Sequence, residues 1–187
     1  MLNFYSPYRE TGFDAWKQKL ELLQSSEVFI RQAEPKREDG QWIRWIQADC
    51  ESTTIRSLED NISTIRQQLV LLAEIDGCPV GFCRALVGRN DADPLFVQLI
   101  AVVPSARRQG AGIALLREAS KRQPKRNIAM AVLDDNVNAQ RLNECFAHSI
   151  GGELQRVNVR RYRRSDLGIA QGERHRPWLI ERPLKAD

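Results

Sequence analysis

Hydrophobic residues recur along the chain in two patterns. Spacings of three and four positions, as at Phe13, Trp16, Leu20 and Leu23, predict an amphipathic helix, because a helix completes a turn about every 3.6 residues. Unbroken apolar runs bounded by turn residues predict buried strands. The expected helices cover 13–23, a segment from 39, a segment from 57, 111–122 and a segment from 136 to 150. The expected strands cover 28–33, 69–75, 79–87, 96–103, 128–133, 154–162 and 178–184.

The ends of several elements carry local signals. Ser57 can cap a helix because Asp60 follows three residues later, and Asp76-Gly77 favours a hairpin turn. Gly151-Gly152 is suited to end a helix. No repeat, low-complexity tract or linker divides the sequence, so we expect one domain over residues 1–187. The order of elements predicts an α/β (α+β) fold, with a mixed sheet and helices on both faces.

The segment Phe96–Ser120 joins a predicted strand to a predicted helix through a basic turn with two glycines, Gly110 and Gly112. Backbone N–H groups at a helix start lack intrahelical partners and carry partial positive charge, so they favour phosphate. Glycine lets the backbone approach a bulky anion, and two arginines, Arg107 and Arg108, add charged donors. We therefore expect a phosphate-binding turn, although such turns also serve simple chain reversal.

Composition places the chain among ordinary globular proteins, with 42% hydrophobic and 28% charged residues. No segment reaches the roughly 18 uninterrupted apolar residues of a membrane span, and the N-terminal residues lack the basic-then-apolar layout of a signal peptide. These features predict a cytoplasmic protein without a membrane partner. The cysteines form no C-x-x-C pair and only two histidines are present, so we expect reduced structural thiols and no metal site.

Positive charge is concentrated toward the C-terminus, although the net charge is only +4. The stretch VNVRRYRRSD, residues 157–166, places four arginines around Tyr162. These are Arg160, Arg161, Arg163 and Arg164. A basic run with an aromatic residue can contact nucleic acid, but it is more often a solvated strand end or loop. The sequence is compatible with both interpretations.

The turn and the order of elements together resemble the GCN5-related N-acetyltransferase (GNAT) family. The signature of that family is a strand that ends in a small apolar run and proline, followed by Q/R-x-x-G-x-G/A, and here Ile100–Pro104 precedes Arg107–Gly112. A second family pattern, V-L-x-x-N-x-x-A-x-x-L-Y, matches Val132–Asn143 except at its last position. Competing phosphate motifs fit worse, because the P-loop G-K-[ST] is absent and Leu115 stands where a dinucleotide fingerprint has its third glycine.

The resemblance covers residues 27–184 as an acetyltransferase core and leaves residues 1–25 as an N-terminal extension with a helix. It implies a mostly antiparallel sheet of about seven strands with a V-shaped splay between the fourth and fifth strands, and acetyl-CoA as the cofactor. The pyrophosphate would lie on the turn amides and the pantetheine arm along the strand before them, where one N–H could stabilise an oxyanion. The implied cofactor-binding residues are Ile100, Ala101, Val102, Arg107, Arg108, Gln109, Gly110, Ala111, Gly112, Asn136 and Ala139.

The resemblance also indicates a missing catalytic base. Many members of the family carry a glutamate on the strand before the turn, at the position of Phe96 in this sequence. Asp93, slightly upstream, is the nearest carboxylate that could take the proton of the attacking ammonium. A water relay is an equal alternative. Three other acids are conceivable: Glu74, Asp91 and Asp49.

The family's usual proton donor to the leaving thiolate is the tyrosine of the L-Y pair, and this chain has Asn143 there. An amide cannot donate a proton at neutral pH, but it can hydrogen-bond the sulfur. Asn143 and Asp93 are therefore the candidate catalytic residues. On the helix of Asn143 we expect Cys145 in the core and His148 at the surface, although either could point toward the site.

The implied activity is acetyl transfer from acetyl-CoA to a primary amine, which we expect to belong to a small molecule. The alternatives are a protein or peptide amine, an aminoacyl-tRNA amine, and a non-catalytic acyl-CoA sensor. A homodimer is compatible with the family. Trp42 and Trp45 lie in a segment that shapes the acceptor site in the family. We expect them to pack as a core pair, the alternative being an aromatic wall that binds a cationic amine.

Overall fold

The computed structural model describes residues 6–50, 53–170 and 172–183. In this part of the chain, seven strands form one sheet in the order β1-β2-β3-β4-β5-β7-β6. The strands are β1 (Phe29–Gln32), β2 (Leu69–Ile75), β3 (Cys78–Val87), β4 (Leu95–Val102), β5 (Ile128–Leu133), β6 (Glu153–Arg156) and β7 (His175–Glu181). The helices are α1 (Phe13–Glu21), α2 (Arg37–Asp49), α3 (Leu58–Gln67), α4 (Ala111–Arg122) and α5 (Val137–Ser149), with short 3-10 turns η1 (Pro7–Arg9) and η2 (Pro104–Ala106).

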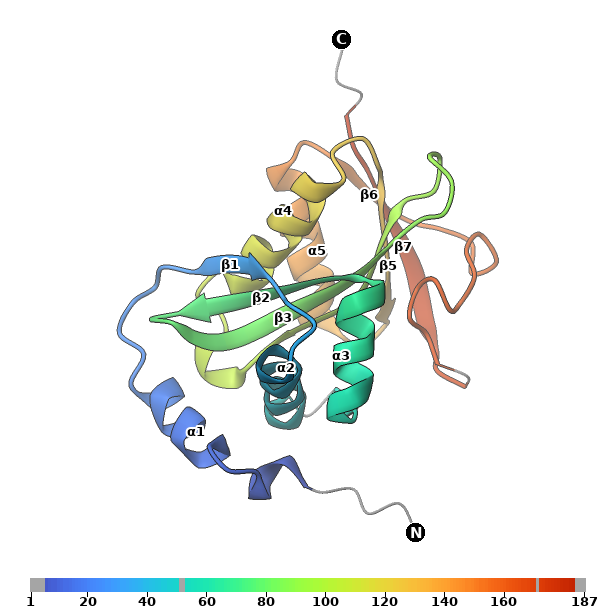
Figure 1. The fold of residues 1–187 in the computed structure, drawn as a ribbon. Coiled ribbons are helices and arrows are strands. Elements are labelled where there is room, and N and C mark those ends of the chain that lie inside the picture. Colours follow the sequence, from blue (N-terminus) through green and yellow to red (C-terminus); the bar gives the residue numbers. More distant parts are fainter. Residues whose placement is uncertain (1–5, 51–52, 171, 184–187) are drawn as a thin grey trace. The chain divides into compact units, whose positions relative to one another are not determined.

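The sheet is mixed. Strands β4 and β5 run parallel, whereas β1 with β2, β5 with β7 and β6 with β7 pair antiparallel. This mostly antiparallel sheet, accompanied by the α-helices of Figure 1, confirms the predicted fold class. Among the helices of the described residues, none is long and apolar enough to cross a membrane.

Local sequence signals account for several element boundaries. Strands β2 and β5 and helix α4 have the predicted bounds. The Ser57 hydroxyl accepts a hydrogen bond from the Asp60 N–H at 3.0 Å, which confirms the predicted cap of α3. Helix α2 begins earlier than predicted, at Arg37, so Gly40 lies inside it. A Cβ atom on Gly40 would lie 2.8 Å from Cγ1 of Ile62, so this glycine allows α2 and α3 to approach closely.

The last two strands differ from the prediction. Strand β6 ends at Arg156 rather than at residue 162, because its pairing with β7 covers only the four residues of β6. Strand β7 begins at His175 rather than at 178, because its first residues pair with the end of β5. It ends at Glu181, and the predicted last residue, Leu184, lies outside the described residues. The segment between β6 and β7 is therefore a long loop.

Backbone contacts divide the chain into two compact units. The first unit contains the described residues of Met1–Phe82 and Ala101–Leu115, and the second those of Cys83–Ile100 and Leu116–Asp187. In the first unit, helices α2 and α3 lie side by side (Figure 1). In the second, β5, β7 and β6 are neighbours, and the loop between β6 and β7 supplies a core residue, Leu167.

Helix α1, which falls in the predicted extension, contributes to the core of the first unit. Trp16 is 2% exposed, and its indole N–H donates to the Pro79 carbonyl at 3.0 Å. Its ring lies 5.5 Å from Phe13 and 5.8 Å from Trp45, measured between centroids. Trp42 meets Trp45 edge-on at 4.9 Å, so the two tryptophans pack together as expected, with Trp45 buried and Trp42 half-buried.

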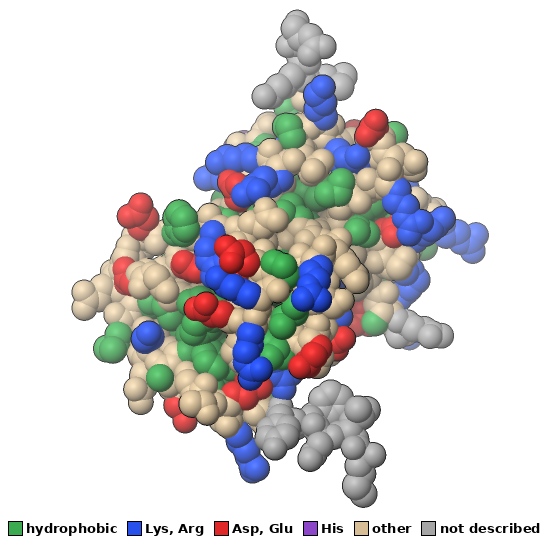
Figure 2. Space-filling view, in the orientation of Figure 1, with side chains coloured by type: hydrophobic (Ala, Val, Ile, Leu, Met, Phe, Trp, Pro, Cys, Tyr) green, Lys and Arg blue, Asp and Glu red, His purple; other side chains and the backbone are tan. Residues whose placement is uncertain are grey.

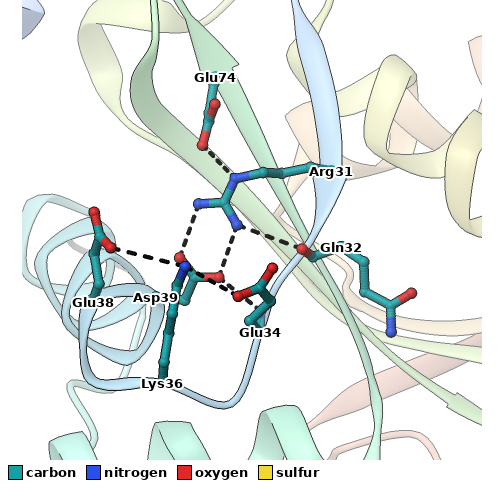
Figure 3. A network of polar contacts seen from close by, with 7 residues as sticks. All are labelled: Arg31, Gln32, Glu34, Lys36, Glu38, Asp39 and Glu74. Atoms are coloured by element: carbon teal, nitrogen blue, oxygen red, sulfur yellow. Dashed lines mark hydrogen bonds and ion pairs between the residues drawn. The ribbon is translucent and has the colours of Figure 1, made fainter.

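A buried ion pair connects β1, β2 and α2 in the first unit (Figure 3). Asp39, in the first turn of α2, is fully buried, and its carboxylate accepts hydrogen bonds from Nη1 and Nη2 of Arg31, each at 2.8 Å. Arg31 Nε donates to Glu74 at 2.7 Å, and the Glu34 N–H donates to Asp39 at 2.7 Å. Burial alone would raise the pKa of Asp39, but its hydrogen bonds with Arg31 and Glu34 hold that pKa below its ordinary value.

Candidate functional site

The connection from β4 to α4 contains two left-handed residues close together. Arg108 has φ of 63° and Gly110 has φ of 86°. A left-handed conformation costs a residue with a side chain on the order of 1–3 kcal/mol, so Arg108 holds local strain. Strained backbone conformations of this kind are common at ligand-binding sites. Gly110 completes the turn, because its carbonyl accepts the Ala114 N–H at 2.9 Å and so starts α4.

The first amides of α4 are suited to bind an anion. The N–H groups of Ala111, Gly112 and Ile113 precede the first intrahelical donor, Ala114, so the helix itself offers them no acceptor. The helix dipole adds partial positive charge at this end. A Cβ atom on Gly110 would meet nothing within 4 Å, so the space beside the turn is open. The turn therefore offers free N–H groups and open space that an anion such as phosphate could occupy.

The two arginines of the turn are placed differently. Arg107 Nε donates to the carbonyl of Val102 at 3.1 Å, which ties the turn back to the end of β4. The same guanidinium lies beside the buried Cys50 thiol; burial raises the pKa of Cys50 to about 11, and Arg107 acts in the opposite direction. Arg108 is exposed. Arg107 thus braces the turn, while Arg108 is the freer candidate to approach a phosphate.

In the second unit, β4 and β5 separate after a short contact. They pair at Leu95–Val97 with Ile128–Met130, and the described pairing of the two strands ends there. Strand β5 continues to Leu133 and pairs with β7 along its whole length. The predicted V-shaped splay is confirmed. Beyond the splay, the backbone of β4 from Gln98 to Ile100 has an edge that a ligand with amide groups could extend.

The N-x-x-A spacing that marked the second family pattern is a helix cap. The Asn136 side-chain oxygen accepts the N–H of Ala139 at 3.0 Å, at the start of α5. Gln140 adds a bond from its amide to the Asp134 carbonyl at 2.9 Å. Asn136 and Ala139 therefore fix where α5 begins, and through it the position of later residues on the helix.

Asn143 lies on the buried face of α5, together with Phe146 and Ala147. It is 6% exposed, and its amide has no hydrogen-bond partner in the part of the chain that the structure describes. Cys145 is exposed, so its predicted core position is wrong. The reason is helical geometry, since two positions along a helix rotate a side chain by about 200°. His148 is exposed, as expected.

The carboxylates considered as bases all have structural partners. Asp93 accepts from the backbone N–H and the side-chain amide of Asn90, at 2.9 and 3.1 Å, and so holds the turn between β3 and β4. The other three acids form ion pairs: Glu74 with Arg31, Asp91 with Arg126, and Asp49 with Lys17. No carboxylate considered from the sequence is left without such an engagement.

The loop between β6 and β7 covers Phe96, the position at which the resemblance places the family's glutamate. The sequence analysis did not predict this contact. Phe96 is 3% exposed and packs with Leu167, and the Tyr162 ring meets it edge-on at 5.3 Å. The Gln98 amide donates to the carbonyls of Ser165 and Asp166, at 3.2 and 2.9 Å. The sequence did contain one sign that this loop packs against the sheet: apolar residues, Leu167 above all, inside an otherwise polar stretch.

Known proteins share the fold of this chain. A model of the Acetyltransferase (GNAT) family matches residues 16–145. No curated protein matches the chain. Among solved structures, the diaminobutyrate acetyltransferase EctA from Paenibacillus lautus, in complex with L-2,4-diaminobutyric acid and coenzyme A, has a TM-score of 0.65 at 24% identity, over 84% of this chain and 96% of that chain.

Two further solved structures are similar. The ribosomal-protein-S18-alanine N-acetyltransferase from Escherichia coli has a TM-score of 0.60 at 20% identity, over 86% of this chain and 96% of that chain. The Salmonella typhimurium protein yncA, solved with its cofactor acetyl-CoA, has a TM-score of 0.58 at 16% identity, over 86% of this chain and 95% of that chain. At these identities the likeness establishes the fold.

Proposed function

Because the chain belongs to the Acetyltransferase (GNAT) family, we propose that it uses acetyl-CoA to acetylate a primary amine, first of all that of a small molecule. The observation that carries this proposal is the strained turn at Arg108 and Gly110, which opens into the free amides of α4. Two similar structures, solved with coenzyme A and with acetyl-CoA, support the choice of cofactor.

Acetyl-CoA supplies an activated thioester, and the chain's residues would hold and orient it. The amides of Ala111 and Gly112 would bind the pyrophosphate, with Arg108 adding charge and Arg107 bracing the turn. The free edge of β4 at Gln98–Ile100 would pair with the amides of the pantetheine arm.

Proton transfer in this proposal depends little on side chains. The position of the family's base is apolar at Phe96, and Asp93 is engaged in its turn, so water is the acceptor that we propose for the ammonium proton. Because a thiol has a pKa of about 8.5, its thiolate can leave without a strong acid. The buried amide of Asn143 would donate a hydrogen bond to the sulfur as charge develops there.

We expect Asn143→Leu to lower kcat about 10-fold or more and to leave KM for acetyl-CoA nearly unchanged. A hydrogen bond to a charged group contributes about 1.5–3 kcal/mol, and this one would form mainly as the thiolate leaves. Steady-state kinetics checks the split, and Glu144→Gln, an exposed change on the same helix, is the control. An unchanged kcat in a folded Asn143→Leu protein would remove Asn143 from the mechanism.

The acceptor is tested by mass spectrometry of acetylated products after incubation with acetyl-CoA and a metabolite extract. Acetylation of a small primary amine is the expected result, and EctA, solved with a small diamine, supports it. A second candidate is an amine carried by tRNA, which the arginine-rich loop between β6 and β7 favours. Acetyl-CoA binding without CoA release from any amine, small or RNA-borne, would instead support a sensor.

A further inference from the structure

The net positive charge of the chain is concentrated in one segment, residues 156–176, which we call the arginine segment. It contains seven arginines, no lysine and two acids, which gives a formal charge of +5. The whole chain carries +4, so the remaining residues sum to −1. Figure 2 shows Lys and Arg side chains gathered over this connection between β6 and β7, at the right-hand edge of the view.

The described residues of the arginine segment are anchored to the second unit, and its seven arginines are exposed. Leu167 is 2% exposed and belongs to the core of the second unit. Arg164 Nη2 donates to the carbonyls of Ala170 and Glu173, at 2.7 and 2.9 Å, which closes the loop on itself. A loop held in this way loses little entropy when it binds a ligand.

Several of these arginines are not neutralised by a neighbouring acid. Arg160, Arg163 and Arg174 are exposed, and their side chains make no ion pair or hydrogen bond with any residue that the structure describes. Asp134 is shared by Arg156 and Arg176, at 2.7 and 3.4 Å. One carboxylate between two guanidinium groups leaves the surface strongly positive.

Arginine and aromatic side chains are paired on this surface. The Arg156 guanidinium lies over the Trp178 ring at 5.0 Å, and the Arg161 guanidinium lies over the Tyr162 ring at 5.5 Å. A guanidinium plane fixed in this way offers a flat face on which a nucleobase can stack. An acidic peptide or a lipid headgroup has no base that could stack on such faces. The guanidinium group of arginine can also form two parallel hydrogen bonds to a phosphate.

We propose that the arginine segment binds single-stranded nucleic acid, with phosphates on the exposed arginines and bases against the arginine–aromatic pairs. The proposed binding uses no residue of the turn at Arg107–Gly112 and does not depend on acetyl transfer. It would, however, suit an enzyme whose acceptor amine is carried by RNA, and that consequence rests on the proposed function.

The test is fluorescence anisotropy with an oligouridine of about 15 nucleotides, titrated from about 50 mM KCl upward. The triple variant Arg160→Gln/Arg163→Gln/Arg174→Gln should bind at least about 10-fold more weakly at the lowest salt. If each arginine contacts one phosphate, the slope of log K against log salt should shrink by about 2, roughly 0.7 for each contact. The same titration with oligothymidine shows whether the segment prefers an RNA or a DNA strand.

The matched control is Lys19→Gln/Arg66→Gln/Lys125→Gln, which removes the same charge from exposed sites outside the segment. It should stay within about 2-fold of the wild type. Equal weakening by both triples, no oligonucleotide binding at low salt, or tighter binding to phosphatidylserine vesicles or to polyglutamate would overturn the proposal. Oligonucleotide binding by a chain that acetylates nothing would leave it standing and remove only the proposed function.

Discussion

Gly110→Glu should abolish acetyl-CoA binding, with an increase in Kd of at least about 100-fold, since placing like charges together costs several kcal/mol. The φ of 86° at Gly110 is unfavourable for any side chain, and the new carboxylate would stand in the open space beside the α4 amides. Pyrophosphate and carboxylate would then compete for the same positive helix end. Isothermal titration calorimetry with acetyl-CoA measures the change directly.

Two control variants separate charge from backbone strain. Gly110→Ala adds the strain without the carboxylate and should weaken binding far less than Gly110→Glu. Gly77→Glu adds the same side chain in the hairpin between β2 and β3, where φ is 69° and a Cβ atom also meets nothing within 4 Å. It should leave acetyl-CoA binding unchanged. Wild-type affinity in Gly110→Glu would mean that the pyrophosphate binds elsewhere.

Asp39→Asn should lower the free energy of unfolding by about 3 kcal/mol. Breaking a buried ion pair costs about 3–5 kcal/mol because the remaining charge stays buried, and the lower value applies here since the Arg31 side chain is 28% exposed and keeps Glu74. Urea unfolding measures the loss. Glu118→Gln, which removes a carboxylate from the surface pair with Arg122, is the control and should cost less than about 1 kcal/mol.

The cost of Asp39→Asn should also depend on pH. Because the pKa of Asp39 is lower in the folded protein than in the unfolded chain, its contribution is complete above the unfolded value, about 4. That contribution is lost as the pH falls through the lower, folded pKa. The wild type should therefore lose its advantage over the variant in acid, and a difference that is the same at pH 7 and pH 3 would contradict this account.

Sequence alone predicted the elements whose signals are local. Strand β5 is a continuous apolar run, and the cap of α3 needs only two residues three positions apart, Ser57 and Asp60. The turn into α4 could be predicted for the same reason, because its residues are consecutive in the chain, and its role in binding phosphate stays a prediction. The splay of β4 from β5 came from the family resemblance rather than from the residues themselves.

The predictions that failed depended on distant partners. Residues 157–162 contain strand formers, but Val157 and Tyr162 pack against the Phe96 cluster instead of extending β6. Strand β7 starts early because β5 offers it a partner. Such contacts have no periodic trace in the sequence.

The seal over Phe96 limits how this site could be redesigned. A glutamate placed there alone would put a carboxylate among Leu167, Leu179 and Ala129, where a charged group finds no water. The strand position and the loop that covers it must therefore be exchanged together. A graft of a glutamate-bearing β4 into this chain would need its own connection between β6 and β7, and with it the arginine segment would be lost.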